Sequence, residues 1–255
     1  ELCSANNISD WAVTSFTTEC PDADMSYTCG FESTEGLVYI PGTTSTTYQI
    51  TTCWTAGTTY ESSSNYSYKA RVQTSSGTSY YSRNTVASNL QSAGSLRLYA
   101  YASSSSSTSS STYYDQWAAM PRLDLEQINT DSVQLEFYAL PAYYNPNTGL
   151  IGTAAYVADN YRPSIVVGVM SDPNDISTFV PLDTCTYNLA KLTTSTVATP
   201  ENDFMFQHFI VPLTGIKGKG QYLAFKTYLI DWIESQPTRP TTAMYTQIYV
   251  DDVSL

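Results

Sequence analysis

The stretch "IYVDDVSL" (residues 248–255) closes the chain and places two carboxylates side by side. Its alternation and its Ile, Tyr and Val content predict a β-strand. Successive side chains of a strand point to opposite faces, so Asp251 shares a face with Tyr249, Val253 and Leu255, and Asp252 lies on the other face. A carboxylate on a buried face is costly unless it is hydrogen-bonded, paired or bound to a metal. The strand therefore predicts that Asp251 is the buried carboxylate and has a partner.

Similar strand-like runs recur along the chain, separated by clusters of Gly, Pro, Asn, Ser and Thr. They are "GLVYI" (36–40), "YSYKARVQT" (66–74), "SLRLYAYA" (95–102), "SVQLEFYAL" (132–140), "SIVVGVM" (164–170), "FMFQHFIVPL" (204–213), "QYLAFKTYLI" (221–230) and "TQIYVDDVSL" (246–255). Many short strands with turn residues between them predict an all-β sandwich or barrel. The serine-rich run 103–112 and the segments 141–164 and 231–245 are predicted as loops.

Composition excludes several classes of function. The 255 residues carry a net charge of -12, from 11 Lys+Arg against 23 Asp+Glu, so binding to nucleic acid or anionic lipid is not expected. The chain has no apolar run of 18 residues, so membrane insertion is not expected either. Few charges (13%), abundant Ser and Thr, and 22 tyrosines are typical of an extracellular β-protein.

Five cysteines and one histidine limit the metal and redox chemistry. The absence of CxxC spacing argues against a zinc site of the usual type. Four of the cysteines lie in the first 53 residues, which predicts a disulfide there. We expect Cys53 to pair with either Cys20 or Cys29, and Cys185 to be free.

Catalytic motifs are not evident, and the chain is predicted not to be an enzyme. His208 is the only possible imidazole base, and the sequence contains no GxSxG nucleophile motif. No pair of carboxylates stands out as a glycosidase pair. The run "SDPND" (171–175) is predicted to cap a turn with its Asp and Asn side chains rather than to bind a metal.

Several segments in order resemble a known family. They are "CGFES" (29–33), "CWT" (53–55), "SAGSLRLY" (92–99), "WAAMPRLDLEQINTDSVQLEFYAL" (117–140), "IVVGVMSDPNDISTFVPLDT" (165–184), "FQHFIVPLTGIKGKGQYLAFK" (206–226) and the closing "IYVDDVSL". This order resembles secreted bacterial jelly-roll modules related to gingipain-type cleaved adhesin domains and to MAM-like domains. The resemblance implies a two-sheet antiparallel β-sandwich of jelly-roll type over residues 31–255.

The amino-terminal residues resemble a different module. "LCSANNISDWAVTSFTTEC" (2–20) is similar to the last strands of a fibronectin type III domain. This resemblance implies that residues 1–20 end a preceding domain, that residues 21–30 form a connector, and that the chain is part of a larger polypeptide.

The jelly-roll resemblance also implies a structural Ca²⁺ where the first and last strands meet. Glu32 and Asp251 match the acidic ligands, and the turn at residues 92–95 would add carbonyl oxygens. The alternative is that Asp251 accepts hydrogen bonds from backbone N–H groups near the strand end.

The expected function is non-catalytic adhesion or ligand binding at a bacterial surface or outside the cell, with a glycan or a host surface protein as partner. Aromatic side chains in the long segments are the candidate contacts: Tyr143, Tyr144, Tyr161 and Trp232. The alternative for each ring is that it packs its loop onto the sandwich. Alternative functions are a structural spacer in a stalk, or an accessory module of a secreted protease or glycosidase.

Overall fold

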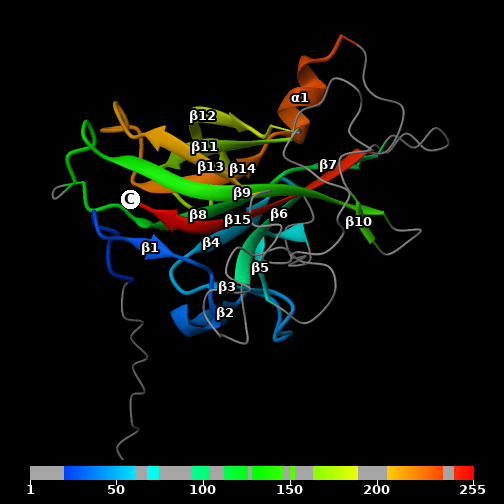
Figure 1. The fold of residues 1–255 in the computed structure, drawn as a ribbon, viewed down its shortest axis with the longest axis horizontal. Helices are drawn as coiled ribbons and strands as arrows, with labels where there is room; N and C mark the ends of the chain where they lie inside the picture. Colours follow the sequence, from blue (N-terminus) through cyan, green and yellow to red (C-terminus); the bar gives the residue numbers. More distant parts are fainter. Residues whose placement is uncertain are drawn as a thin grey trace, which may run out of the picture.

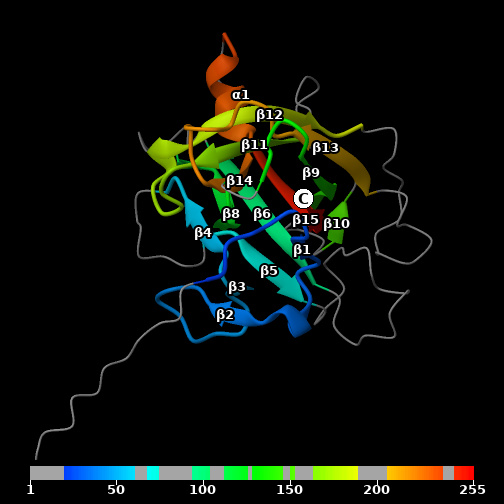
Figure 2. The same cartoon turned by 90° about the vertical axis from the view of Figure 1, so that its left-hand side faces the viewer.

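The computed structural model describes residues 20–60, 68–74, 94–103, 112–125, 128–145, 150–152, 163–188, 206–237 and 244–255. Within these ranges the chain forms two β-sheets packed face to face, with one short α-helix at an end of the sandwich (Figures 1 and 2). The strands are β1 (Thr28–Cys29), β2 (Leu37–Tyr39), β3 (Gln49–Thr51), β4 (Thr55–Thr58), β5 (Arg71–Thr74), β6 (Gly94–Ser103), β7 (Thr112–Tyr114), β8 (Gln116–Arg122), β9 (Gln134–Asn145), β10 (Leu150–Gly152), β11 (Ser164–Met170), β12 (Val180–Thr186), β13 (Gln207–Pro212), β14 (Tyr222–Thr227) and β15 (Met244–Ser254). The helices are η1 (Ser33–Glu35), η3 (Ile176–Thr178) and α1 (Leu229–Ser235).

The described strands divide unequally between the sheets. The larger sheet follows the order β10-β9-β15-β6-β5-β3-β2, with β1, β7 and β13 as additional partners of β15, β6 and β9. The smaller sheet follows the order β12-β11-β14-β8-β4. All these pairings are antiparallel, and the predicted all-β sandwich is confirmed. The last strand of the chain lies in the middle of the larger sheet, where it holds β9 and β6 together.

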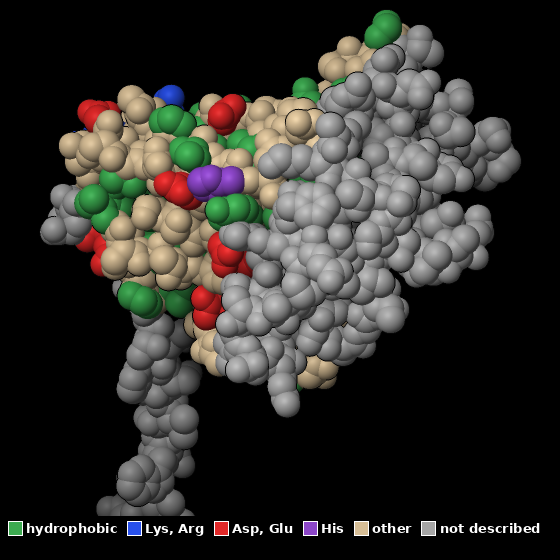
Figure 3. Space-filling model, viewed as in Figure 1, with side chains coloured by type: hydrophobic (Ala, Val, Ile, Leu, Met, Phe, Trp, Pro, Cys, Tyr) green, Lys and Arg blue, Asp and Glu red, His purple; other side chains and the backbone are tan. Residues whose placement is uncertain are grey.

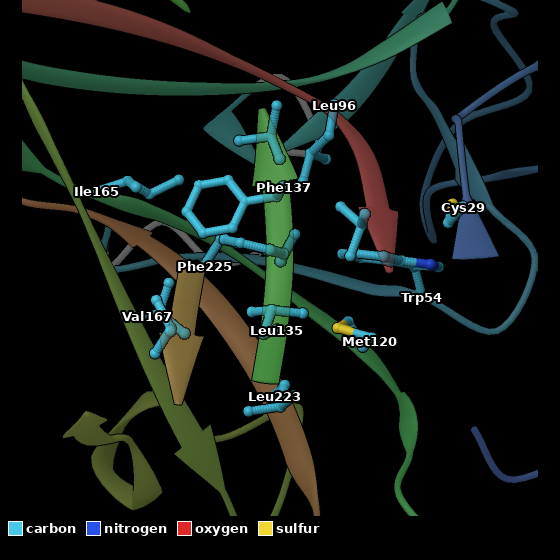
Figure 4. Close-up of a cluster of buried hydrophobic side chains, with 14 of the residues drawn as sticks. Cys29, Trp54, Leu96, Met120, Leu135, Phe137, Ile165, Val167, Leu223 and Phe225 are labelled. Carbon is cyan, nitrogen blue, oxygen red and sulfur yellow. The ribbon is translucent and has the colours of Figure 1, made fainter. Parts of the chain in front are cut away.

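Aromatic and aliphatic side chains from both sheets fill the space between them (Figure 4). Trp54 stacks on Phe225 with ring centroids 6.1 Å apart, and its indole N–H donates to the hydroxyl oxygen of Tyr27 at 2.7 Å. Phe137 meets Phe225 edge-to-face at 5.0 Å. These ring contacts add to the stabilisation that comes from burying apolar area.

Alternation in β6 assigns its two faces. Leu96 and Leu98 are fully buried in the core between the sheets, whereas Arg97 and Tyr99 are only partly buried. The sequence run 95–102 is thus a strand with an apolar inner face and a polar, aromatic outer face, as its period of two predicts. This outer face carries the residues on which the functional argument depends.

In β15 the alternation is interrupted. Asp251 pairs with Tyr138 and Ser254 pairs with Glu136, so β15 uses three steps where β9 uses two. This one-residue bulge coincides with a positive φ of 48° at Asp252. Beyond the bulge, Val253 joins the core that also contains residues 248 and 250. The prediction that Val253 continues the face of Asp251 is therefore wrong.

Three other expected elements differ from the structure. The strand expected over residues 221–230 ends at Thr227, and the helix α1 occupies part of the expected loop 231–245. Leu229 and Ile233, one helical turn apart, are buried against Ala100 and Ala102. The expected loop 141–164 is partly strand, because β9 extends to Asn145 and pairs with β10. Most of the serine run, 104–111, lies outside the described residues.

Residues 21–30, predicted as a connector, pack on the sandwich. Ala23 and Cys29 belong to the core, and Asp22 forms an ion pair with Arg122. A disulfide joins Cys20 to Cys53, which is one of the two pairings that the sequence left open. Cys29 and Cys185 are buried free thiols. The proposed fibronectin-like segment 1–19 lies outside the described residues.

Candidate functional site

Two regions of the structure bring together polar or aromatic side chains that are candidates for binding an ion or a ligand. The first is the junction where β15 changes its partner. Up to Val250, β15 pairs with β6, and from Val253 onwards it pairs with β1 (Figure 1). Gly94 begins β6 beside this change, and a Cβ on it would lie 1.9 Å from the carbonyl oxygen of Phe31. The two backbones therefore touch, and only glycine fits there.

Three acidic side chains surround the α-carbon of Gly30 at this junction. A Cβ at that position would lie 3.7 Å from Glu32 Cγ, 3.8 Å from Asp252 Oδ1 and 3.9 Å from Glu35 Oε1. Phe31 and Asp252 both have positive φ, at 57° and 48°. Non-glycine residues in this conformation often occur at functional sites, where the surroundings hold them.

The carboxylate of Glu32 lacks the partners that a buried anion needs. Both of its oxygens are buried without a hydrogen-bond partner. Burial raises the pKa of Glu32 to about 7, and repulsion from Glu35 and Asp252 adds to this. The backbone N–H of Gly94 offsets part of this rise in the pKa. This carboxylate is poised either to bind a proton or to bind a cation.

The neighbouring carboxylates have backbone partners. Glu35 accepts hydrogen bonds from the N–H groups of Gly30 and Glu32, both at 2.8 Å. Asp251 is fully buried, as its alternation predicts, and its Oδ1 accepts the N–H of Asp252 at 2.8 Å. This is the kind of hydrogen bond that the alternative interpretation of Asp251 expects. It leaves the second oxygen of Asp251 to other interactions.

A calcium ion fits this junction in part. Ca²⁺ prefers six to eight oxygen ligands drawn from carboxylates, carbonyls and water. The two carboxylate oxygens of Glu32, which lack hydrogen-bond partners, and the nearby carboxylate of Asp252 are ligands of the type that a dication prefers. Among the described residues, no group of three or more His, Cys, Asp or Glu side chains is placed to hold a metal ion. Backbone carbonyls and water would therefore have to supply the remaining ligands.

The second region is a cluster of tyrosines on β6 and its neighbours. We call it the tyrosine cluster; its members are Tyr60, Tyr68, Tyr99, Tyr101 and Tyr114. The ring of Tyr114 lies 5.1 to 5.9 Å from the other four rings. Tyr114 is buried, and the other four are partly exposed. Four separate segments thus build one aromatic surface with hydroxyl groups.

The chain crosses from the larger sheet to the smaller one directly after Tyr114. At the crossing, Asp115 is buried and accepts a hydrogen bond of 2.6 Å from the hydroxyl group of Thr227. The next residue, Gln116, bonds the backbone N–H of Tyr99 and the backbone carbonyl of Tyr68 through its side-chain amide. These bonds tie the tyrosine cluster to both sheets.

Of the four candidate ligand residues predicted from sequence, the structure describes only the side chain of Trp232. Tyr143 and Tyr144 lie on β9, but their side chains are outside the described part, and Tyr161 is outside it altogether. Trp232 packs on the small apolar cluster beneath α1. Tyr99 and Tyr101 were missed, although their outward positions in "LRLYAYA" were readable from the alternation. No pattern in the sequence indicates that Tyr99 and Tyr101 lie close to Tyr60, Tyr68 and Tyr114.

His208 lies on an exposed strand face, where Figure 3 shows the histidine beside acidic side chains. Its Nε2 is 3.0 Å from Glu136 Oε2, and its ring stacks on Tyr138 with centroids 4.6 Å apart. His208 is therefore a surface histidine whose ring contacts are with Glu136 and Tyr138.

The turn at residues 171–175 also behaves as expected. Asp172 accepts the N–H of Asn174, and Asp175 accepts the N–H of Ser177, both at 2.9 Å. The prediction that these side chains cap a turn is confirmed.

Comparisons with known proteins add little beyond the fold. No protein-family model and no curated protein matches the chain. One similar solved structure is the K2 cleaved adhesin domain of Lys-gingipain, with 11% identity, a TM-score of 0.41, and coverage of 86% of this chain and 96% of that domain. Another is the K3 cleaved adhesin domain of Lys-gingipain from Porphyromonas gingivalis w83, with 14% identity, a TM-score of 0.33, and coverage of 72% and 88%. At these values neither likeness decides the family, so the argument for function rests on the residues of the chain itself.

Proposed function

We propose that the domain is a non-catalytic adhesion-type module that binds a glycan through the tyrosine cluster. The convergence of five tyrosine rings on β6 and its neighbours is the observation that carries the proposal. A tyrosine ring offers its apolar face to the C–H groups of a sugar, and its hydroxyl group can bond a sugar hydroxyl. Four of these rings are partly exposed, so ligand can reach them.

An extracellular or cell-surface location is consistent with this function. The Cys20–Cys53 disulfide suits an oxidising compartment. In the described residues, no helix is long and apolar enough to cross a membrane. The resemblance to cleaved adhesin modules supports a place in a larger polypeptide beside other domains.

Glycan binding can be tested by screening the chain on an immobilised panel of glycans and measuring hits by calorimetry. Tyr99→Ala and Tyr101→Ala should each weaken binding by up to about tenfold, because an aromatic ring contact contributes about 0.5–1.5 kcal/mol. Tyr39→Ala is the matched control, since Tyr39 is 48% exposed on the distant edge strand β2. Binding to no glycan would favour the structural spacer. Capture of a host surface protein instead would favour that partner.

We also propose that the junction binds one structural Ca²⁺. Glu32 would be the central ligand because both of its oxygens are buried without partners. Asp251 is the second ligand that the family resemblance implies. Burial raises the pKa of Glu32, and repulsion from Glu35 and then from Asp252 adds to this rise. The ion would replace this repulsion with attraction and would hold Phe31 against the start of β6.

Thermal unfolding with and without a chelator tests the ion. Chelation should lower the melting temperature of the parent chain, because the unfolded chain lacks the site. Glu32→Gln should abolish the response. Comparison of Asp251→Asn with Asp252→Asn then identifies the second carboxylate. A parent chain that is indifferent to chelator would leave Glu32 as a protonated carboxyl and Asp251 as a hydrogen-bond acceptor.

A further inference from the structure

Two arginines lie side by side next to the tyrosine cluster. Arg71 on β5 pairs directly with Arg97 on β6, and their side chains occupy the outer face of the larger sheet. Like charges directly opposite each other in an antiparallel pair are destabilising. The net charge of the chain is -12, so two adjacent cationic side chains on one face are unexpected.

Both guanidinium groups lack part of their hydrogen bonding. The Nε–H groups of Arg71 and Arg97 are buried without a hydrogen-bond partner. Burial and the charge of Arg97 lower the pKa of Arg71 to about 10, and interactions with Tyr48 and Tyr249 oppose this shift. An unsatisfied buried donor costs about 1–3 kcal/mol, and more where the group is charged.

Aromatic rings frame the two arginines. The guanidinium carbon of Arg71 lies 4.6 Å from the ring centroid of Tyr48, and that of Arg97 lies 5.4 Å from the ring centroid of Tyr99. Arg97 is also opposite Tyr249 in the sheet. Since Tyr99 belongs to the tyrosine cluster, the cationic pair and the aromatic surface are continuous.

The nearby carboxylate does not balance both charges. Asp251 is two residues beyond Tyr249 on β15, so it follows Tyr249 on the same face before the bulge. It is the acidic residue that the strand register brings towards Arg97, and part of it is used on the N–H of Asp252. Among the described residues that the register brings to this part of the face, one carboxylate faces two guanidinium groups.

We propose that Arg71 and Arg97 bind the anionic group of an acidic sugar, a carboxylate or a sulfate, whose ring lies on the tyrosine cluster. This inference rests on the proposed glycan-binding function and names the class of glycan. A guanidinium group matches the planar spacing of carboxylate and sulfate oxygens and can donate two parallel hydrogen bonds. Because the Nε–H groups are buried, the anion would meet the terminal N–H groups of these two partly exposed side chains.

Inorganic sulfate first tests the anion site without any sugar. Sulfate should raise the melting temperature of the parent chain more than sodium chloride of the same ionic strength does. Arg97→Met should remove this difference, and Arg97→Lys should keep part of it, so that loss of charge is separated from loss of packing. Arg122→Met is the control, because Arg122 lies on the smaller sheet and pairs with Asp22.

Calorimetry with two oligosaccharides of equal length, one sulfated and one neutral, then tests the ligand. The sulfated ligand should bind the parent at least tenfold more tightly than the neutral one, and Arg71→Met or Arg97→Met should each remove that preference. Equal binding of both ligands, unaffected by the arginine variants, would overturn the acidic class and leave glycan binding in place. Binding of neither would overturn both proposals. Stabilisation by sulfate without binding of the sulfated ligand would overturn the inference of a sugar ligand.

Discussion

The stability of the domain should fall as the pH rises from 4 to 7, because of Asp115. Burial raises the pKa of this carboxyl group to about 7, although the Thr227 hydroxyl and Lys226 favour its charged form. In the unfolded chain the pKa returns to the ordinary value of 3.8. Between these values the folded state binds one proton more than the unfolded state, so the free energy of unfolding decreases with rising pH.

The size of the effect follows from the shift. A change from 3.8 to about 7 is about 3 pH units, and each unit corresponds to about 1.4 kcal/mol, which gives a loss of roughly 4 kcal/mol by pH 8. Asp115 is 1% exposed, so solvent screens the charge of its carboxylate only weakly. Asp115→Asn keeps an acceptor for the Thr227 hydroxyl at 2.6 Å but cannot ionise. The variant should therefore be more stable than the parent at pH 8, and the two should converge towards pH 4.

Urea unfolding at a series of pH values between 5 and 8 measures this difference. Starting at pH 5 avoids the titration of Asp24 and Asp175, whose pKa values are lowered by hydrogen bonds from Ser26 and Ser177. Glu32→Gln, measured in parallel, removes a second carboxyl group whose pKa is raised. A parent whose stability rises over this range, or an Asp115→Asn variant with the same decline as the parent, would refute the reasoning.

Two further predictions concern the junction and the disulfide. Gly94→Ala should cost more than about 2 kcal/mol in urea unfolding, because its Cβ would lie 1.9 Å from the Phe31 carbonyl oxygen; Gly30→Ala, with its nearest contact at 3.7 Å, should cost far less, and equal costs would show that the contact is relaxed. Cys20→Ser should cost about 3–4 kcal/mol, since it opens a loop with a sequence separation of 33. Reduction should destabilise the parent but not this variant, and an unchanged parent would contradict the assigned bond to Cys53.

Local alternation made part of the fold and of the candidate site predictable. In the run 95–102, Leu96 and Leu98 alternate with Arg97 and Tyr99, and the structure places the leucines in the core. A period of two is a property of the single strand, so no knowledge of its neighbours is needed. The convergence of Tyr99 with rings from other segments depends on sheet order, which the sequence did not specify.

Features that depend on distant partners were missed. The alternation in β15 fails at Asp252 because the strand exchanges β6 for β1 there, and β1 lies more than two hundred residues earlier in the chain. The helix α1 follows β14 after a single residue, and its apolar spacing is limited to Leu229 and Ile233. Seven residues are too few for a clear helical period, so the sequence predicts a strand and a loop there instead of a helix.

The strand β6 links the two regions that we propose to be functional. It begins at Gly94, against the junction with Glu32, and it carries Arg97, Tyr99 and Tyr101 further along. β15 pairs with residues 96–102 of β6 and β5 pairs with residues 94–97, so both edges of the strand are held at residues 96 and 97. A strand held on both edges presents its outward side chains at fixed spacing, which reduces the ordering cost of ligand binding. A Ca²⁺ at the junction would therefore act on ligand binding through the register of β6 rather than through direct contact with the ligand.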